Sequence, residues 1–328
     1  QGSPTGVPEA MVGVPIINLD AEKLRLENLI RDGIEPRIVG LSMQPVALSG
    51  SKYALIIRIP KSWVSPHMVK YQGVSKFYSR NSSGKYPLDV GEIRTAFLRS
   101  ESVAQHLRNF RADRLAKIVG GETPILMEET AKIAIHLVPL RAFDAGVQFD
   151  INRLATTPDK LQQIRSTGWS YRHNFDGILS YSLSSRSSKA YSYLQVFRNG
   201  IIEALDTTLL SPYDDGGKLI PGGVWERIII DAVQRYLVLQ QGLGIDPPLV
   251  LMLTLLGVHG YKMAVNPSRT FREAYPIDRD SLIIPERVIE DFDADVGEVL
   301  KPCFDAIWNA AGWPKSINYD DNGKRIPR

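Results

Sequence analysis

The stretch from Ile59 to Arg80 gathers side chains that can contact phosphate. Pro60 and Pro66 restrict the backbone there, so the loop between them presents its donors from a preorganised conformation. In an extended segment, alternate residues share a face, which places the Tyr78 hydroxyl and the Arg80 guanidinium about 6.6 Å apart along the chain. Arginine is a good bidentate donor to phosphate. We therefore predict a nucleic-acid-binding surface made by Lys61, Ser62, His67, Lys70, Lys76, Tyr78 and Arg80.

The charge of the chain is concentrated around the same residues. Residues 51–120 hold 13 Lys or Arg against 4 Asp or Glu, whereas the net charge of the whole chain is +3. Clustered positive charge raises the local concentration of anions, so this segment favours an anionic partner. The alternative is a solvated basic surface with no partner. For Arg108, Arg111, Arg114 and Lys117, whose spacing spreads them around a helix, we expect phosphate contact or solvation rather than a base-reading stripe.

The elements that position these residues predict a mixed fold of the α/β (α+β) class. The pattern of residues 20–31 predicts an amphipathic helix that ends at Gly33. Strands are expected at 53–59 and 76–80, because apolar and β-branched residues dominate the first and alternation marks the second. Asp89 and Glu92 form a capping-box pattern at the start of a helix reaching about Arg99, and a second helix is expected over 102–119.

Gly120-Gly121, followed by Pro124, is the expected domain boundary, giving domains over 1–120 and 121–328. The second domain should be an α+β regulatory or interaction domain. It has expected strands at 131–140, 171–183 and 191–208, with a hairpin turn at Asn199-Gly200, which tolerates positive φ. The helical spacing of apolar residues from Trp225 to Leu237 predicts a long helix that ends before Gly242. The apolar run 249–258 fits a buried strand or a short core helix, and a last helix should hold Val299 to Trp308.

Five polar residues of the second domain are candidates for a ligand pocket or a protein interface: His173, Asp176, Arg198, Asn199 and Glu203. With His136 they could hold a metal or perform acid–base chemistry, but their spacing does not support either function. The alternative is that they are satisfied structural polar groups around a sheet and a hairpin. Cys303 lies in an apolar helical pattern, which favours core packing. No motif indicates a cofactor, ATP hydrolysis, serine hydrolysis or zinc proteolysis.

The order of motifs in the first domain resembles a known family. A β-branched strand is followed by Ile-Pro-Lys-Ser at 59–62, Pro66-His67, Phe-Tyr-Ser-Arg at 77–80 and the helix after Asp89. This order resembles the second half of the Schlafen-type AlbA-like domain of bacterial proteins, and Ile34 to Ile38 resembles the approach to its long strand. The resemblance covers roughly the first 100 residues. It implies an α/β fold and nucleic-acid binding.

In related animal Schlafen domains, acidic residues cleave transfer RNA. That family opens with an acidic motif ending Glu-Phe-Lys, then an Ala-Asn-Ser or Asn-Thr stretch and Gly-Gly, and this sequence lacks all of them. The resemblance therefore assigns no catalytic residue here. It implies a divalent metal only if carboxylates lie upstream of Gln1.

These observations support three functional hypotheses. The first is a bacterial-type nucleic-acid-binding protein, acting in transcription or anti-phage defence. The second is a metal-dependent endoribonuclease, and the third is an oligomeric scaffold, a homo-oligomer whose basic segment meets acidic protein. The single cysteine and the absence of an export signal favour a cytoplasmic location, and the longest apolar run is too short to cross a membrane.

Overall fold

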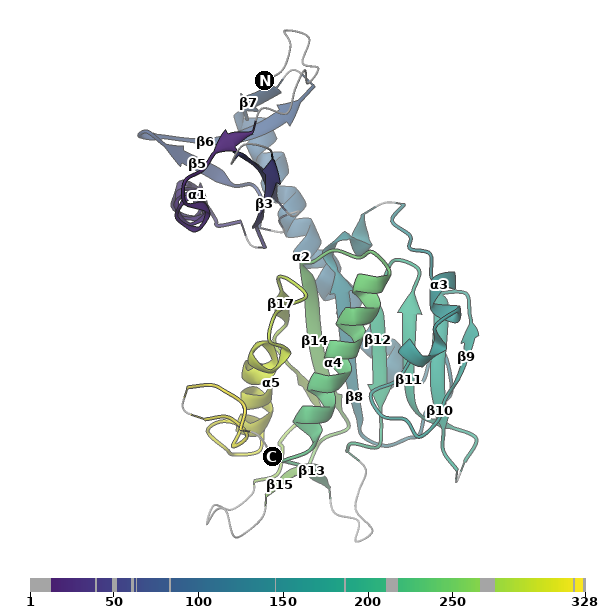
Figure 1. The fold of residues 1–328 in the computed structure, drawn as a ribbon. Coiled ribbons are helices and arrows are strands. Elements are labelled where there is room, and N and C mark those ends of the chain that lie inside the picture. The colour runs from purple at the N-terminus through teal and green to yellow at the C-terminus, as the bar shows by residue number, and fades with distance from the viewer. Residues whose placement is uncertain are drawn as a thin grey trace. The chain divides into compact units, whose positions relative to one another are not determined.

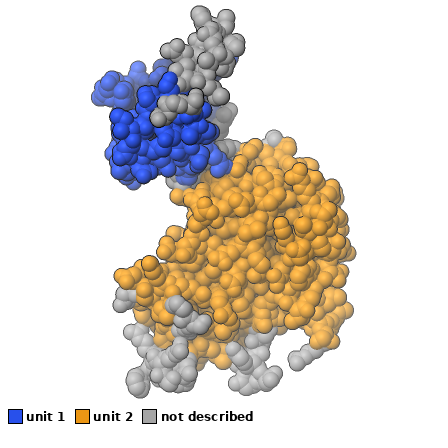
Figure 2. All heavy atoms as spheres, in the orientation of Figure 1, with its two compact units in different colours: residues 1–106 blue, residues 107–328 orange. Residues whose placement is uncertain are grey.

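The structure is a computed structural model that describes residues 13–38, 40–48, 52–59, 62, 64–82, 84–144, 146–185, 187–210, 218–265, 275–320 and 322–326, without the side chains of 99–102. The chain divides into two compact units, Gln1–His106 (unit 1) and Leu107–Arg328 (unit 2), coloured separately in Figure 2. Helices and strands are both abundant (Figure 1), which confirms the predicted mixed α and β class.

Unit 1 contains helix α1 (Leu19–Gly33) and two small sheets. Asn18 caps α1 by accepting a hydrogen bond from the Ala21 amide at 3.0 Å, and the predicted helix is confirmed. The three-stranded sheet has the order β1-β4-β3, and the four-stranded sheet has the order β2-β5-β6-β7. The strand bounds are Val14–Pro15 (β1), Ile34–Glu35 (β2), Ser42–Leu48 (β3), Lys52–Arg58 (β4), Met68–Tyr71 (β5), Val74–Asn81 (β6) and Gly84–Pro87 (β7).

Unit 1 buries few of its described side chains. Met43 and Pro66 are its buried residues in the described ranges, and α1 has none. Large apolar side chains such as Ile56 and Phe97 stay more than half exposed. The described part of unit 1 therefore encloses little side-chain surface, and its strands are joined by the backbone ladders of two small sheets.

Helix α2 (Val90–Val119) is continuous, which corrects the expectation of two helices over this range. The capping box is present, since the Asp89 amide donates to Glu92 Oε2 and the Glu92 amide donates to Asp89 Oδ1. No Gly or Pro interrupts residues 92–119, and a serine is tolerated inside a helix. The helix ends at the predicted glycine pair, where Gly121 has φ +76°. The division between the units falls inside α2, at His106 and Leu107, and not at Gly120-Gly121.

Unit 2 is built on an eight-stranded sheet whose order is β16-β14-β8-β12-β11-β10-β9, with β17 also pairing to β14. The expected hairpin is present, and Gly200 at its turn has φ +83°. The expected strand over 171–183 is split into two by a turn at 174–176. The strands are β8 (Lys132–Pro139), β9 (Ser170–His173), β10 (Gly177–Leu183), β11 (Ala190–Phe197), β12 (Ile202–Asp206), β14 (Leu249–Leu256), β16 (Ser281–Ile283) and β17 (Arg287–Ile289).

Helices cover both faces of this sheet. On one face, α4 (Trp225–Gly242) and α5 (Val296–Ala310) share a buried core cluster with alternate residues of β8, such as Ile133 and Ile135. Figure 1 shows α4 lying across the sheet and α5 beside β17. On the other face, Leu115 and Ile118 of α2 pack over Ala134. Both long helices were expected, and the 249–258 run is the buried strand β14. Shorter elements are α3 (Asn152–Ala155), two 3-10 turns (Leu140–Phe143 and Pro158–Lys160), and the parallel pair β13 (Leu219–Pro221) and β15 (Lys262–Ala264).

Among the helices of the described ranges, none is both long enough and apolar enough to cross a membrane.

Candidate nucleic-acid interface

The β6 strand of unit 1 presents its cations on one exposed face. Lys76, Tyr78 and Arg80 alternate with Phe77 and Ser79 and are all exposed. The antiparallel register places Lys85 of β7 directly opposite Arg80, on the same face. The Lys85 ammonium lies 5.4 Å from the centroid of the Tyr78 ring. We call Lys76, Tyr78, Arg80 and Lys85 the basic face.

Tight turns and one aromatic contact fix which way the basic face points. Gln72 and Gly73 both have positive φ, at 49° and 77°, which gives a two-residue hairpin turn between β5 and β6. On the opposite side of β6, Phe77 packs edge-on against Phe97 of α2, with ring centroids 5.9 Å apart. Because successive strand residues point to opposite faces, anchoring Phe77 to α2 turns Tyr78 toward solvent.

The charged groups of the basic face are available for a partner. Within the described ranges, no carboxylate lies at ion-pair distance from Lys76, Arg80 or Lys85. Tyr78 keeps 37% of its surface exposed, and Tyr71, on the same face opposite Val74, keeps 61%. Three cations and two exposed tyrosines can therefore offer hydrogen-bond donors to phosphate and ring faces to bases.

Lys70 does not belong to this face, which corrects the predicted grouping. It pairs with Ser75 and so points to the opposite side of the sheet from Lys76, which pairs with Val69. There it forms an ion pair with Glu35 of β2, and this hydrogen bond lowers the pKa of Glu35. The register of the β5–β6 hairpin, which the turn at Gln72-Gly73 sets, decides this placement. Lys61 lies outside the described residues.

Ser62 and His67 make local contacts in the loop before β5. The Ser62 hydroxyl accepts a hydrogen bond from the Val64 amide at 3.3 Å. His67 is half-buried, and its Nδ1 lies 2.6 Å from the carbonyl oxygen of Pro36. Since a carbonyl only accepts, Nδ1 donates this hydrogen bond. Both side chains hold the loop in place, and neither lies on the strands of the basic face.

Lys85 was missed by the sequence reasoning. The segment Asn-Ser-Ser-Gly at 81–84 carries the signal of a turn, and a hairpin closed there brings Lys85 opposite Arg80. The charge of Lys85 alone did not distinguish it from the other lysines of the segment.

Arg111 is buried and the side chain of Arg114 is only 12% exposed, which corrects the expectation of phosphate contact or solvation for these two cations. Arg111 donates to the Leu253 carbonyl and the Thr254 hydroxyl of β14, at 2.8 and 3.0 Å. Arg114 makes a bidentate ion pair with Glu203 of β12, with both N–O distances 2.7 Å. Helix α2 lies against the sheet at this point, so cations on its inner side are enclosed and must find acceptors inside unit 2.

Glu203, predicted to belong to a ligand pocket or interface, is a buried structural carboxylate. Each of its oxygens accepts two hydrogen bonds: Oε1 from Arg114 and Tyr193, and Oε2 from Arg114 and His136. Burial favours the neutral acid, but the hydrogen bonds and charges of Arg114 and His136 outweigh it and hold the pKa of Glu203 at about 2. With all its acceptor sites filled, Glu203 has none left for a ligand.

The other predicted residues of the second domain lie around the turns at the ends of β9 and β11. The Arg198 amide donates to the Asp176 carbonyl at 3.0 Å, and its guanidinium donates to the Phe175 carbonyl. Asn199 donates to the Ala142 carbonyl, and His173 is exposed at the end of β9. The structure brings Asp176 and Arg198 together through backbone contacts and separates both from Glu203.

Among the described residues, no three His, Cys, Asp or Glu side chains form a group that could hold a metal ion. Cys303 is buried in α5, and burial raises the pKa of its thiol to about 11, so it is a packed core residue. Comparisons with protein-family models, curated proteins and solved structures gave no match to this chain. The resemblance to Schlafen-type AlbA-like domains therefore stays a prediction from the sequence.

Proposed function

We propose that the basic face of unit 1 binds the phosphate backbone of nucleic acid. The observation that carries the proposal is the joint exposure of Lys76, Arg80 and Lys85 on one side of two paired strands, without a described carboxylate partner. Nucleic acid presents closely spaced negative charge, and neutralising it with Lys and Arg releases counterions, which drives association. A cytoplasmic location, favoured by the single cysteine, belongs to the same proposal.

The two tyrosines favour a single strand over a duplex as the ligand. Tyr71 and Tyr78 share the face that carries the cations and keep much of their rings exposed. Aromatic side chains interleaved with cations are typical of surfaces on which unpaired bases stack while the backbone is held by charge. In a duplex the bases are already stacked on each other, so the tyrosines would add little there. The proposal is one of binding and assigns no catalytic residue.

A comparison of two cations on opposite faces of one small sheet tests this proposal. Fluorescence anisotropy with labelled single-stranded DNA, single-stranded RNA and duplex DNA at low salt measures affinity for the wild type, Arg80→Gln and Lys70→Gln. We expect Arg80→Gln to weaken single-strand binding roughly five- to tenfold, equivalent to about 1–1.4 kcal/mol. Lys70→Gln should stay near wild type, because Lys70 faces away and is paired with Glu35.

Circular dichroism on each variant controls for folding. The absence of binding by the wild type to all three nucleic acids at low salt would refute the proposal. An equal loss from both substitutions would show that overall charge, and not the basic face, determines affinity. Binding to an acidic peptide with the same dependence on Arg80 would favour the scaffold hypothesis instead.

A further inference from the structure

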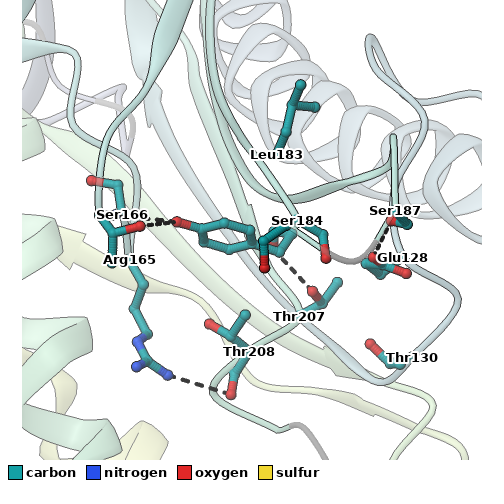
Figure 3. Close-up of a pocket in the computed structure, with 12 residues that line it drawn as sticks. Glu128, Thr130, Arg165, Ser166, Leu183, Ser184, Ser187, Thr207 and Thr208 are labelled. Carbon is teal, nitrogen blue, oxygen red and sulfur yellow. Dashed lines mark hydrogen bonds between the residues drawn. The ribbon is translucent and has the colours of Figure 1, made fainter.

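Unit 2 contains a pocket at one end of its eight-stranded sheet, with a volume of about 800 Å³ (Figure 3). Its walls come from the segments before β8 and β9, the end of β10, the start of β11 and the segment after β12. A cavity of this size accepts a small molecule with a ring and several substituents. No residue of the basic face lines it, and neither does any of the five polar candidates of the second domain.

Most of the residues that line this pocket carry a hydroxyl group. Nine of the twelve lining residues carry one, and Leu183 supplies the single aliphatic side chain. A hydroxyl can donate one hydrogen bond and accept others, and the Thr207 and Thr208 hydroxyls, whose protons are bonded inside the protein, can still accept from a ligand rich in hydroxyl groups. Most small-molecule pockets are lined by apolar side chains, and this composition argues against a lipophilic ligand. The hydroxyl-bearing residues of the wall include Thr130, Thr167, Ser187, Tyr191, Thr207 and Thr208.

Several of these groups are held in place by the frame of unit 2. The buried Asp206 accepts from the Thr208 amide and hydroxyl, at 2.8 and 2.9 Å. The Tyr191 hydroxyl accepts from the Thr167 amide at 3.2 Å, and the Tyr191 carbonyl accepts from the Thr207 hydroxyl at 3.0 Å. These contacts fix the pocket wall before any ligand arrives, which lowers the entropic cost of binding.

One cation and one carboxylate stand on opposite sides of the pocket, as Figure 3 shows. Arg165 donates from one nitrogen to the Thr208 carbonyl at 3.4 Å, and within the described ranges it has no carboxylate partner. Its remaining guanidinium donors can bind an anion in a bidentate manner. Across the pocket, Glu128 accepts from the Ser187 hydroxyl and can accept further hydrogen bonds.

We propose that this pocket binds a sugar monophosphate, with the phosphate on Arg165 and the sugar hydroxyls on the serine and threonine wall and Glu128. A bare anion would leave most of the cavity unfilled and would face Glu128 without a hydroxyl to offer it. A neutral sugar would leave the guanidinium of Arg165 without a counter-ion. The proposal is independent of the nucleic-acid proposal, because it rests on different residues of the other unit.

Isothermal titration calorimetry on the full chain tests the proposal with four probes: ribose 5-phosphate, glucose 6-phosphate, glucose and inorganic phosphate. We expect at least one of the two sugar phosphates to bind at least tenfold more tightly than both glucose and inorganic phosphate. Arg165→Gln should weaken that binding by tenfold or more, because it removes the phosphate contact. Thr130→Val, which replaces a hydroxyl by a methyl group of similar size, should weaken it about three- to tenfold.

Arg227→Gln is the matched control, because Arg227 is exposed on α4 and does not line the pocket. This variant should bind the sugar phosphate as tightly as the wild type does. The proposal is overturned if neither sugar phosphate binds, or if Arg165→Gln and Arg227→Gln bind alike. If inorganic phosphate bound as tightly as the sugar phosphates, the sugar would not contribute to recognition. If glucose bound as tightly as the sugar phosphates, the phosphate would not contribute. Either result would overturn the proposal. Thermal unfolding of each variant shows that a loss of binding does not come from a loss of fold.

Discussion

The two units differ in how many of their polar and apolar side chains they bury. Unit 2 encloses a large apolar core on both faces of its sheet and, inside it, a hydrogen-bonded cluster around Glu203. Unit 1 leaves side chains such as Ile56 and Arg80 exposed and buries few of the residues that the structure describes. Because apolar burial provides most of the free energy of folding, the core of unit 2 stabilises that unit. Unit 1 instead exposes side chains that can contact a partner.

The same contrast divides the basic segment over 51–120. Arg111 and Arg114 belong to this segment by sequence, but their side chains pack inside unit 2. There Arg111 contacts a backbone carbonyl and Arg114 contacts the buried carboxylate of Glu203. Arg80 and Lys85 stay exposed, without a carboxylate partner in the described ranges. A count of charges along a sequence therefore overestimates the charge that a surface presents, because a cation enclosed in a domain is hydrogen-bonded there and does not reach the surface. Only the exposed cations can meet a partner in solution.

The largest expected effect comes from breaking the buried ion pair. Arg114→Ala leaves the carboxylate of Glu203 without its bidentate partner, and we expect unit 2 to lose about 3–5 kcal/mol of unfolding free energy. Urea denaturation followed by circular dichroism measures this. The control is Lys117→Ala on the same helix, where Lys117 makes an exposed pair with Asp113 and the loss should be under about 1 kcal/mol. Similar losses from both substitutions would contradict the structural role assigned to the cluster.

Acid should weaken unit 2 through the same carboxylate. The folded pKa of Glu203, about 2, is below its ordinary value of 4.5, so its contribution is complete above pH 4.5 and is lost as the pH falls toward 2. The size of this loss is on the order of 3 kcal/mol. We expect Glu203→Gln to be less stable near neutral pH and to lose this acid dependence, as urea denaturation across the range would show. The control Glu22→Gln, on the exposed helix α1, should keep the acid dependence of the wild type. A pH profile of Glu203→Gln identical to that of the wild type would contradict the assignment of this dependence to Glu203.

A smaller effect compares the same substitution in the two units. Ile135→Val removes a methylene from the core of unit 2 and should cost about 1 kcal/mol. Ile56→Val changes a side chain that is 56% exposed in unit 1, and its effect should stay within about 0.5 kcal/mol. Equal effects in thermal denaturation would mean that Ile56 is covered in solution and that the contrast between the units is overstated.

Much of the fold could be predicted because its signals are local. Apolar periodicity predicted α1, α4 and α5, and the Asn199-Gly200 pair predicted the β11–β12 hairpin. The continuity of α2 could not be predicted, since serines near residue 100 are compatible with either a break or a helix interior.

The candidate sites were predicted only in part, because they depend on long-range pairing. Strand alternation correctly placed Tyr78 and Arg80 on one face, but the side of Lys70 depends on the register of a hairpin. The acceptors of Arg114 lie in a distant strand, so its burial has no local signal. The hydroxyl pocket is assembled from five segments that are separate in sequence, and no motif marks it.

The salt dependence of single-strand binding tests the central claim most directly. Each phosphate contact by Lys or Arg adds about 0.7 to the slope of log affinity against log salt for a single strand. We predict that a variant with Lys76→Gln, Arg80→Gln and Lys85→Gln together has a slope shallower by about 2 than the wild type, because three contacts are lost. Identical slopes for the two proteins would contradict the assignment of the basic face as the surface that contacts the nucleic-acid backbone.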